Sequence, residues 1–482
     1  MSSFKNVPVN IVGPSSEHRD ASYSNQVTMN YMVEGHPTGS HPGILISWPG
    51  SKPFASIAGS IPRGIYEKLG GVVYKISDTS LYSCDSAGSE TLIGTIEGTN
   101  RCVFGDDGTN LIIVTGSKWY QYDGSTLTEF SPPTLSTGLA VSPGNSVAFL
   151  GGFAIYDIDG GKFIVSDFGD PNSFQSNNFA TAESSGDNLM RVFSFKERVY
   201  MFGGLSVEIW ESGIGNPPLQ KSSITMQIGL GDVHSVAHSI NYVYFRANDG
   251  LVYRFSSNQP VNITSGFMAQ DFRDFNLGTA VAYTYNLDGA FYYVINFVSD
   301  NKTYYFSEKT GELSPGVNNW AQLSTGIGQD RYIGEMYVRA FRKDLVEKKN
   351  SGDILELDKA TFTDDGEISL KIRETAPIHA GLLGEEGRRL EMSWIEVIMK
   401  KGVGTQSGTG VDPRLYFQAS FDGSNSYSNE HDVEIGRLGS TMIKVRWYHS
   451  QSFYEAAFKT IGYDPVLYSI HGASIGLKLV GH

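Results

Sequence analysis

The stretch VFSFKERVYMFGGLSVEIW, from Val192 to Trp210, predicts three short β-strands separated by two turns. Runs rich in Val, Phe, Tyr and Ile favour half-buried pleated strands, and charged residues or glycines between such runs favour turns. Here the charged triplet KER forms the first interruption, and the Gly203-Gly204 pair forms the second. The stretch therefore predicts a small antiparallel meander.

Similar stretches recur along the chain. Asn248-Asp249-Gly250 separates two aromatic runs in residues 235–256, and Leu287-Asp288-Gly289 does so in residues 282–297. Asp-Gly between apolar runs is a strong hairpin signal, because these residues tolerate the positive φ of a tight primed turn. Further copies lie at 111–130 and 147–165, with a weaker, interrupted copy at 332–362. About five to seven units at a spacing of roughly forty residues predict a β-propeller of six or seven blades, ahead of a generic β-sandwich or a solenoid.

The two ends of the chain lack this pattern. Residues 1–54 are rich in Asn, Pro, Gly and His up to Trp48-Pro49-Gly50, so we expect an extended arm that packs on the propeller or on a neighbouring molecule. From residue 384 onward the apolar and polar residues alternate over longer strands, as in a small β-sandwich with one solvated face. The predicted fold is all-β, with an N-terminal arm at 1–54, a β-propeller at 55–383 and a C-terminal β-sandwich domain at 384–482.

Composition narrows the classes of function. The formal net charge is −14, from 51 acidic and 37 basic residues. This balance argues against a general nucleic-acid-binding surface, because nonspecific affinity for phosphate comes from Lys and Arg. No apolar run approaches the roughly 20 residues of a membrane-spanning helix, and the N-terminus lacks the apolar segment of a signal peptide. Cys84 and Cys102 are expected to be free buried thiols, with a single bridge between them as the open alternative.

The sequence shows no catalytic constellation, and it assigns no catalytic, metal-binding or cofactor-binding residue. No phosphate-binding loop, dinucleotide fingerprint, nucleophile elbow or zinc-protease motif occurs. His234 and His238 are four residues apart, which on a strand separates them by about 13 Å at ~3.3 Å of rise per residue. That distance is too long for one metal ion. We therefore expect a protein that is not an enzyme and that holds no cofactor.

Several acidic residues could be mistaken for a catalytic set. Propeller glycosidases place carboxylates on loops at one end of the axis. Each candidate is instead expected in a hairpin turn, where Asp is favoured for backbone reasons. The candidates are Asp106, Asp107, Asp157 and Asp159. The triplet Asp167-Phe168-Gly169 is likewise expected to be a turn, because no other kinase motif accompanies it.

The order of several segments resembles a known family. These segments are NQVTMNYMVE at 25–34, SDFGDPNSF at 166–174, the block FATAESSGDNLMRVFSFKERVYMFGGLSVEIWE at 179–211, FQASFDGSNSYS at 417–428 and FKTIGYDPVLYSIHGASIGLKL at 458–479. In this order they resemble the packaged-DNA stabilisation proteins of short-tailed phages, which are tail accessory or tail hub proteins. The resemblance covers nearly the whole chain and is most specific from Ala182 to Trp210 and in the C-terminal strands.

The resemblance implies a structural virion protein of the phage tail, made in the host cytoplasm. Such a hub assembles as a hexameric ring below the portal-adaptor ring, helps to retain packaged DNA, and attaches the tail needle and the tailspikes. Genomic DNA would pass through the channel without sequence-specific binding. The contacts are expected on the N-terminal arm and the C-terminal sandwich, because a closed propeller leaves few free edges. No individual binding residue is implied.

Two other functions stay open at the level of sequence. The first is a carbohydrate-binding or carbohydrate-cleaving propeller that acts in receptor recognition. The second is a monomeric scaffold propeller that binds host proteins. Glycan binding would favour the first alternative, and a monomer without phage tail partners would favour the second.

Overall fold

Most of the chain is built from short antiparallel strands that alternate with tight turns. The computed structural model describes residues 4–17, 20, 22–35, 43–182, 186–266, 268–308 and 319–480. Within these residues, seven groups of four strands pair as antiparallel meanders. The stretch from Val192 to Trp210 supplies β20, β21 and most of β22, so the predicted meander is confirmed.

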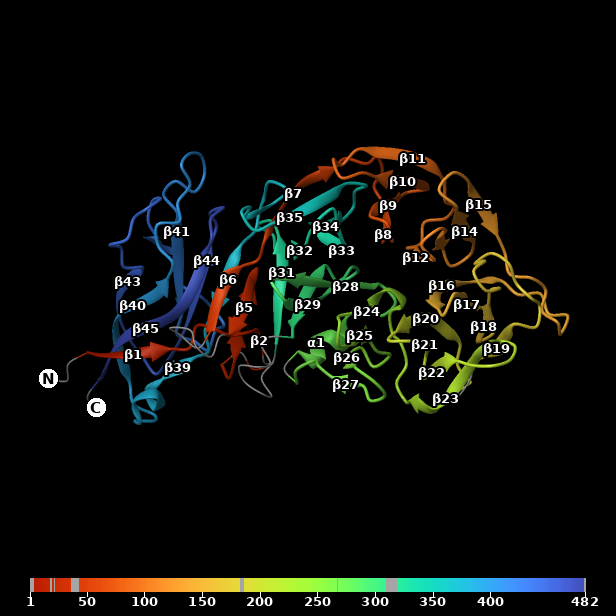
Figure 1. Cartoon of the computed structure of the whole chain (residues 1–482). Helices are drawn as coiled ribbons and strands as arrows, with labels where there is room; N and C mark the ends of the chain where they lie inside the picture. The colour runs from red at the N-terminus through yellow and green to blue at the C-terminus, as the bar shows by residue number, and fades with distance from the viewer. Residues whose placement is uncertain are drawn as a thin grey trace.

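The seven groups are the blades of a propeller (Figure 1). Blade 1 is β8 (Pro62–Lys68), β9 (Val72–Ser77), β10 (Ser80–Cys84) and β11 (Glu90–Thr95); blade 2 is β12 (Val103–Asp106), β13 (Leu111–Val114), β14 (Trp119–Tyr122) and β15 (Leu127–Phe130). Blade 3 is β16 (Pro143–Leu150), β17 (Phe153–Ile158), β18 (Lys162–Val165) and β19 (Phe179–Thr181); blade 4 is β20 (Leu189–Phe195), β21 (Arg198–Gly203), β22 (Val207–Ser212) and β23 (Leu219–Met226). Blade 5 is β24 (Ala237–His238), β25 (Val243–Arg246), β26 (Val252–Phe255) and β27 (Val261–Asn262); blade 6 is β28 (Ala280–Leu287), β29 (Ala290–Phe297), β30 (Lys302–Ser307) and β31 (Trp320–Thr325). Blade 7 is β33 (Gly334–Ala340), β34 (Lys343–Lys348), β35 (Ile354–Asp358) and, from the start of the chain, β7 (Gly50–Ala55).

The first strand of each blade faces the centre of the ring (Figure 1). Tight turns connect successive strands, as the Asp-Gly signals predict. At the β28–β29 turn, Asp288 and Gly289 have φ angles of 50° and 79°, which are the positive values of a primed hairpin turn. Lys196 and Glu197 take the same conformation between β20 and β21, although neither is glycine. The predicted β-propeller is thus confirmed, and the described strands give it seven blades.

The start of the chain closes the ring. Strand β7 pairs antiparallel with β35, with Ala55 opposite Ile354 and Gly50 opposite Asp358. Because β7 runs directly into β8, this pairing joins the last blade to the first. A Cβ atom on Gly50 would lie 2.4 Å from the carbonyl oxygen of Thr363, so only glycine fits where the closing strand passes this neighbour.

Buried charges reinforce the closure between blades 7 and 1. Lys75 of β9 and Arg101 of the loop before β12 both bind the carboxylate of Glu347 on β34. Arg101 also binds Glu335 of β33, and Arg331 of β32 (Asp330–Arg331) binds the same carboxylate. The side chains of Lys75 and Glu347 are fully buried. The chain of ion pairs therefore links blades 1, 2 and 7 near the axis.

The C-terminal domain packs two sheets against each other. The first sheet has the order β43 (Arg446–Phe453), β40 (Leu390–Met399), β45 (Ser469–Leu479), β6 (Gly43–Ser47) and β5 (Tyr31–Gly35), with β1 (Lys5–Val9) also paired to β45. The second contains β38 (Lys371–Glu374), β44 (Glu455–Gly462), β41 (Arg414–Ser420) and β42 (His431–Glu434), with β39 (Ile378–His379) on β44. The short remaining elements are β2 (Ser16–Glu17), β3 (Asn25–Gln26), β4 (Thr28–Met29), β36 (Thr363–Asp364), β37 (Glu367–Ile368), the 3-10 turns at Val233–Ser235 and Ala380–Leu383, and the helix α1 (Ala269–Asp274).

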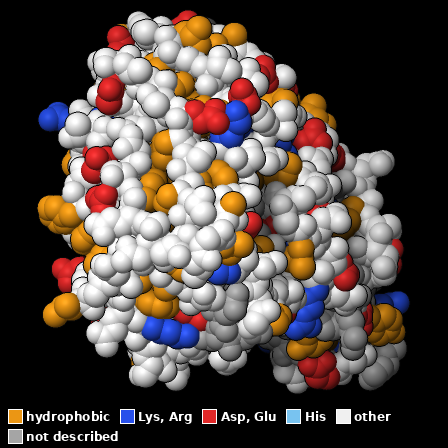
Figure 2. All heavy atoms as spheres, turned by 90° about the vertical axis from the view of Figure 1, so that its right-hand side faces the viewer, with side chains coloured by type: hydrophobic (Ala, Val, Ile, Leu, Met, Phe, Trp, Pro, Cys, Tyr) orange, Lys and Arg blue, Asp and Glu red, His pale blue; other side chains and the backbone are white. Residues whose placement is uncertain are grey.

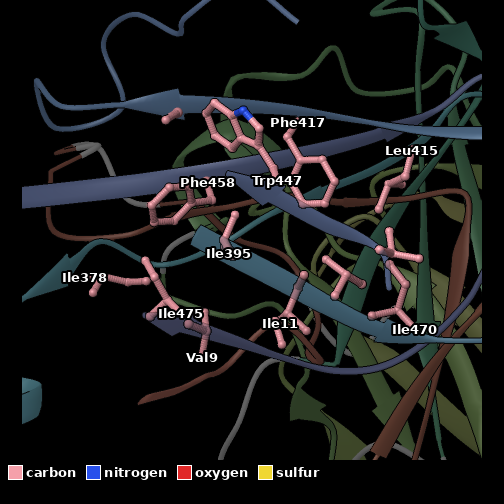
Figure 3. Packing of buried hydrophobic residues seen from close by; sticks show 14 of the residues in the cluster. Val9, Ile11, Ile378, Ile395, Leu415, Phe417, Trp447, Phe458, Ile470 and Ile475 are labelled. Carbon is pink, nitrogen blue, oxygen red and sulfur yellow. The ribbon is translucent and has the colours of Figure 1, made fainter. Parts of the chain in front are cut away.

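The N-terminal arm belongs to this domain. Strands β1, β5 and β6 pair in the first sheet, and Val9 and Ile11 pack beside Ile395 and Ile475 in the core between the sheets (Figure 3). We expected the arm on the surface of the propeller or on a neighbour; its strands β1, β5 and β6 join the C-terminal sheet, while β4 pairs with blade 6. Its scattered apolar residues are too few for a core of their own, and long-range pairing with β45 buries them.

One continuous sheet joins the propeller to the C-terminal domain. Met29 of β4 pairs with Gln322 of β31 on one side and with Ile372 of β38 on the other. The next residue, Asn30, donates its side-chain amide to the carbonyls of Ser324 (2.9 Å) and Leu370 (2.8 Å). Blade 6 and the C-terminal sheet therefore share hydrogen bonds through the arm.

Two buried side chains fix the arm at this junction. The Arg373 guanidinium on β38 is fully buried and donates to four acceptors of the arm: the carbonyls of Ile11 and Pro14, and the side chains of Thr28 and Gln26. Trp48 is 2% exposed and lies among four tyrosine rings of blade 6 and the segment after it. Its ring centroid lies 5.0–6.5 Å from those of Tyr285, Tyr292, Tyr305 and Tyr332.

Cys84 and Cys102 are both free and buried, and burial raises the pKa of each thiol to about 12. Among the described residues, no helix has the length and apolarity needed to cross a bilayer.

Replacing Glu347 with Gln tests the ionic closure of the ring. We expect E347Q to lower the free energy of unfolding by about 3–5 kcal/mol, because it leaves Lys75 buried without its counter-charge. Glu129, which is 45% exposed and pairs with Lys118, is the matched control, and E129Q should lower it by less than about 1 kcal/mol. Urea denaturation followed by tryptophan fluorescence measures both, and equal losses would contradict the assignment.

Replacing Arg373 with Met tests the attachment of the arm. R373M leaves four arm acceptors without their donor, so we expect faster amide hydrogen exchange over residues 5–35 than in the unmodified protein. The control is R414M, because Arg414 is 40% exposed and binds Asp432 at the domain surface. Unchanged exchange over residues 5–35 in R373M would show that the strand pairing alone holds the arm.

Candidate interaction surface

The C-terminal domain presents two open strand edges on one side. Among the described strands, β43 pairs with β40 alone and β42 pairs with β41 alone, and β42 and β43 lie next to each other. An unpaired edge offers a row of backbone N–H and C=O groups to another chain. We call the two edge strands, with the neighbouring loop 421–427, the C-terminal edge surface.

Two aromatic rings and an arginine occupy the outer face of this edge. The Arg446 guanidinium lies 4.0 Å from the ring centroid of Trp394 and 5.8 Å from that of Tyr448. Glu396 accepts a hydrogen bond from Arg446 Nε at 2.9 Å, which holds the guanidinium over the rings. Tyr448 is 71% exposed. Trp, Tyr and Arg are the residues that most often dominate binding energy at protein interfaces.

Four rings stack along the rim between the two sheets. Phe421 and His449 have ring centroids 6.2 Å apart, His449 and Trp447 4.7 Å, and Trp447 and His431 5.1 Å. Burial, together with the nearby His431, lowers the pKa of His449. The four rings therefore form an aromatic ridge next to the open edges.

A shallow hollow adjoins this ridge. It has a volume of about 460 Å³ and is lined by Phe421, Asp422, Phe453, Tyr454 and Glu455 among others. Tyr454 is 65% exposed, and one carboxylate oxygen of Glu455 is buried without a hydrogen-bond partner among the described residues. The hollow thus combines apolar rings with two acidic side chains. None of these side chains forms a nucleophile–base pair.

The propeller rim has a different character. Figure 2 shows the rim that lies farthest from the C-terminal domain, where apolar, acidic and basic side chains are interspersed. Single exposed apolar residues are normal on a folded protein and need no partner. The aromatic and arginine side chains of the C-terminal edge surface, in contrast, contact one another.

Three of the four acidic candidates act within turns, as predicted. Asp106 and Asp107 accept backbone N–H groups of Gly108 and Thr109 at 2.8 Å each, and Asp159 accepts that of Ser142 at 2.9 Å. The triplet at 167–169 is also a turn, in which Gly169 has a φ of 71°. These carboxylates are therefore occupied by the backbone.

The prediction for Asp157 is wrong. It lies inside β17 and is 2% exposed, not in a hairpin turn. Its carboxylate accepts the N–H groups of Asn145 and Ser146, at 2.8 and 2.6 Å, and burial raises its pKa to about 6. The Ser146 hydroxyl binds this carboxylate and accepts the N–H of Val192, so Asp157 couples blades 3 and 4.

The two neighbouring histidines do not form a ligand pair. His234 lies on the 3-10 turn before β24, and His238 lies on β24 itself, against the rings of Phe193 and Phe195. Burial, followed by the charges of Arg191 and Arg101, lowers the pKa of His234 to about 3. No group of three or more potential metal ligands occurs in the described part of the chain.

The sequence did not point to the aromatic cluster of the edge surface. Trp394 lies on β40 and Tyr448 on β43, in segments far apart in the chain that pair as neighbouring strands. Neither segment carries a motif, and only the register between the two strands places the rings on one face. The alternation of apolar and polar residues in both segments was the only signal available.

Comparison with solved structures yields distant similarities. The chain is similar to the extracellular domain of the putative one component system BT4673 from B. thetaiotaomicron, with a TM-score of 0.43, 12% identity, and coverage of 82% of this chain and 48% of that chain. It is also similar to BamB from Moraxella catarrhalis, with a TM-score of 0.39, 10% identity, and coverage of 74% and 98%. The chain thus spans about half the length of the BT4673 domain. Both TM-scores are below 0.5, so we draw no functional inference from them.

Comparison at the level of sequence is more informative. No curated protein matches the chain. Residues 5–362 match the family model Phage_stabilise, described as bacteriophage P22 Gp10, beta-propeller. The matched residues run from β1 to the end of blade 7, so they include the arm and the whole propeller. Because this match covers well over half of the chain, the protein belongs to the Phage_stabilise family of phage beta-propeller proteins.

Proposed function

We propose that this protein is the tail hub of a short-tailed phage. In this role six copies form a ring that joins the portal-adaptor ring to the tail needle and the tailspikes and helps to retain packaged DNA. The observation that carries the proposal is the family match over residues 5–362. The protein would be made in the host cytoplasm and incorporated into the virion tail.

The construction of the molecule suits a load-bearing part. A hub must withstand the pressure of packaged DNA through rigid contacts, and this needs no bond-making chemistry. The sheet through β31, β4 and β38 makes the propeller and the C-terminal domain share backbone hydrogen bonds. A force applied to one domain therefore reaches the other through a ladder of strands and not through a flexible linker.

A ring also requires two different contact patches on each subunit, because a closed ring is built from heterologous interfaces. The C-terminal edge surface supplies the properties of one such patch: open strand edges, an exposed tyrosine, and arginine held over aromatic rings. This surface lies outside the residues that the family model matches. We infer that it adapts this hub to its own neighbours in the tail.

The charge of the protein fits a DNA-conducting assembly. Binding to the DNA backbone requires clusters of Lys and Arg, whereas this chain has a net charge of −14. Like charge keeps a polyanion from adhering to the surface that it passes. We propose that genomic DNA passes the hub without sequence-specific contact.

The first test is a size measurement of the purified protein, alone and mixed with portal-adaptor complexes. We expect recruitment of about six copies to each adaptor ring. Y448D should weaken assembly by at least about tenfold, because a charge replaces an exposed aromatic anchor. L92D is the matched control, since Leu92 is 62% exposed on an outer strand of blade 1, and it should assemble normally.

Three outcomes discriminate between the hypotheses. Failure of the unmodified protein to join the adaptor ring would overturn the hub proposal. Normal assembly of Y448D would leave the hub in place and exclude the C-terminal edge surface as a contact. A protein that ignores adaptor rings but binds phage-receptor glycans on an array would favour the carbohydrate alternative.

A further inference from the structure

The hollow beside the aromatic ridge is lined by three rings and two carboxylates. The rings belong to Phe421, Phe453 and Tyr454, and the carboxylates belong to Asp422 and Glu455. The other described lining residues are uncharged: Ser22, Gly423 and Ser452. None of the described lining residues is basic, so the two acidic side chains have no counter-charge within the hollow.

The two carboxylates are not neutralised from outside the hollow either. Asp422 accepts hydrogen bonds from the hydroxyl of Ser420 at 2.8 Å and from the backbone N–H groups of Asn425 and Ser426 at 3.1 and 3.0 Å. Hydrogen bonds, led by one from the Ser426 hydroxyl, lower the pKa of Asp422 to about 2. Neither Asp422 nor Glu455 forms an ion pair with a residue that the structure describes. A bound cation would therefore balance the charge of the hollow.

The three rings favour the same kind of ligand. The face of an aromatic ring attracts ammonium and guanidinium groups, and aromatic rings commonly surround organic cations. Tyr454 is 65% exposed and Phe421 is 37% exposed, so a ligand can reach both rings from solvent. Phe453 packs against Phe421, with ring centroids 5.8 Å apart. A basic side chain would lay its apolar stem on these rings and bring its charged end to the carboxylates.

The same domain already pairs cations with rings and carboxylates. Lys459 Nζ lies 4.1 Å from the ring centroid of Tyr427 and 3.3 Å from the carboxylate of Glu374. Arg446 likewise lies over Trp394 while Glu396 binds its guanidinium, as described above. In both cases one cation contacts a ring and a carboxylate together. The hollow presents rings and carboxylates in the same combination.

An open strand edge leads to the hollow. Ser452 and Phe453 line the hollow and are the last residues of β43, which pairs with β40 alone among the described strands. Residues 451–453 pair with 390–392 of β40 in regular register. Outside that ladder, the one described hydrogen bond to their backbone comes from the Gln451 side chain to the Ser452 carbonyl, at 3.3 Å. An extended chain alongside could therefore pair with this edge and project a side chain into the hollow.

We propose that the hollow binds an arginine or lysine side chain of a partner polypeptide that runs in extended form along residues 451–453. Strand addition gives affinity through backbone hydrogen bonds, and a side-chain pocket beside the edge gives specificity. The two carboxylates select a basic residue, and the rings hold its stem. The inference specifies the partner of the C-terminal edge surface, so it rests on the proposed role of that surface as a contact.

Fluorescence anisotropy with a labelled octapeptide tests the site on the full chain. The probe alternates threonine and valine around one central arginine, because β-branched residues favour an extended strand. We expect saturable binding that becomes at least about tenfold weaker when glutamine replaces the arginine, since the cation contacts are lost. Acetyl-arginine amide should compete at least about tenfold less well than the unlabelled peptide, because it cannot pair with the strand edge.

Four variants of the protein locate the binding. Y454S and E455Q should each weaken peptide binding by about three- to tenfold, because each removes one side chain that contacts the cation. F168S is the control for the ring, since Phe168 is 73% exposed in the turn after β18. E385Q is the control for the charge, since Glu385 is 47% exposed and pairs with Arg388 in the same domain. Both controls should bind the peptide as the unmodified protein does.

The outcomes separate this inference from the hub proposal. Absence of peptide binding, equal binding of the glutamine peptide, or equal losses in the hollow variants and their controls would overturn the site. Equal competition by acetyl-arginine amide would overturn a polypeptide as the occupant. Peptide binding by a protein that does not join adaptor rings would overturn the hub and leave the hollow as a contact for another partner.

Discussion

The hydrogen-bonded ladder between β7 and β35 is the contact on which the rest of the structure depends. A propeller without a closing strand is an open arc whose first and last blades both expose an edge. Here the strand that closes the arc is also the end of the arm, and the arm has already passed through the C-terminal domain. The same segment therefore closes the ring and attaches the C-terminal domain to the propeller. This short segment contains Asn30, Trp48 and Gly50.

The sequence predicted the features that depend on neighbouring residues. Asp288-Gly289 and the alternating runs around them report a hairpin because the turn and its strands are contiguous, and the repetition of such units predicted the propeller. Pairing between distant segments left no comparable signal. Nothing in residues 5–9 indicates that β45 is their partner, so the position of the arm could not be derived. The burial of Asp157 could not be predicted either, because it depends on contact with the adjacent blade 4. The C-terminal edge surface depends on the register of β40 with β43, so it could not be predicted from the sequence.

Total charge and local charge describe different properties of this molecule. The net value of −14 is a sum over the whole chain, buried residues included. It does not reveal that Arg101 and Arg331 share the buried carboxylate of Glu335 beside the closure of the ring. The strand order decides where buried charged residues lie. The net charge of the whole sequence carries no information about those positions.

The partnership of the first strand with the last has a consequence for synthesis on the ribosome. Strand β1 pairs with β45, whose residues are among the last to be translated. At a translation rate of about 5–20 residues per second, the arm waits about 25–90 s before its partner emerges. During that time the blades can form one after another, while the apolar residues of β1, β5 and β6 stay without their core. The nascent chain thus carries the apolar residues of the arm without their final core for most of its synthesis.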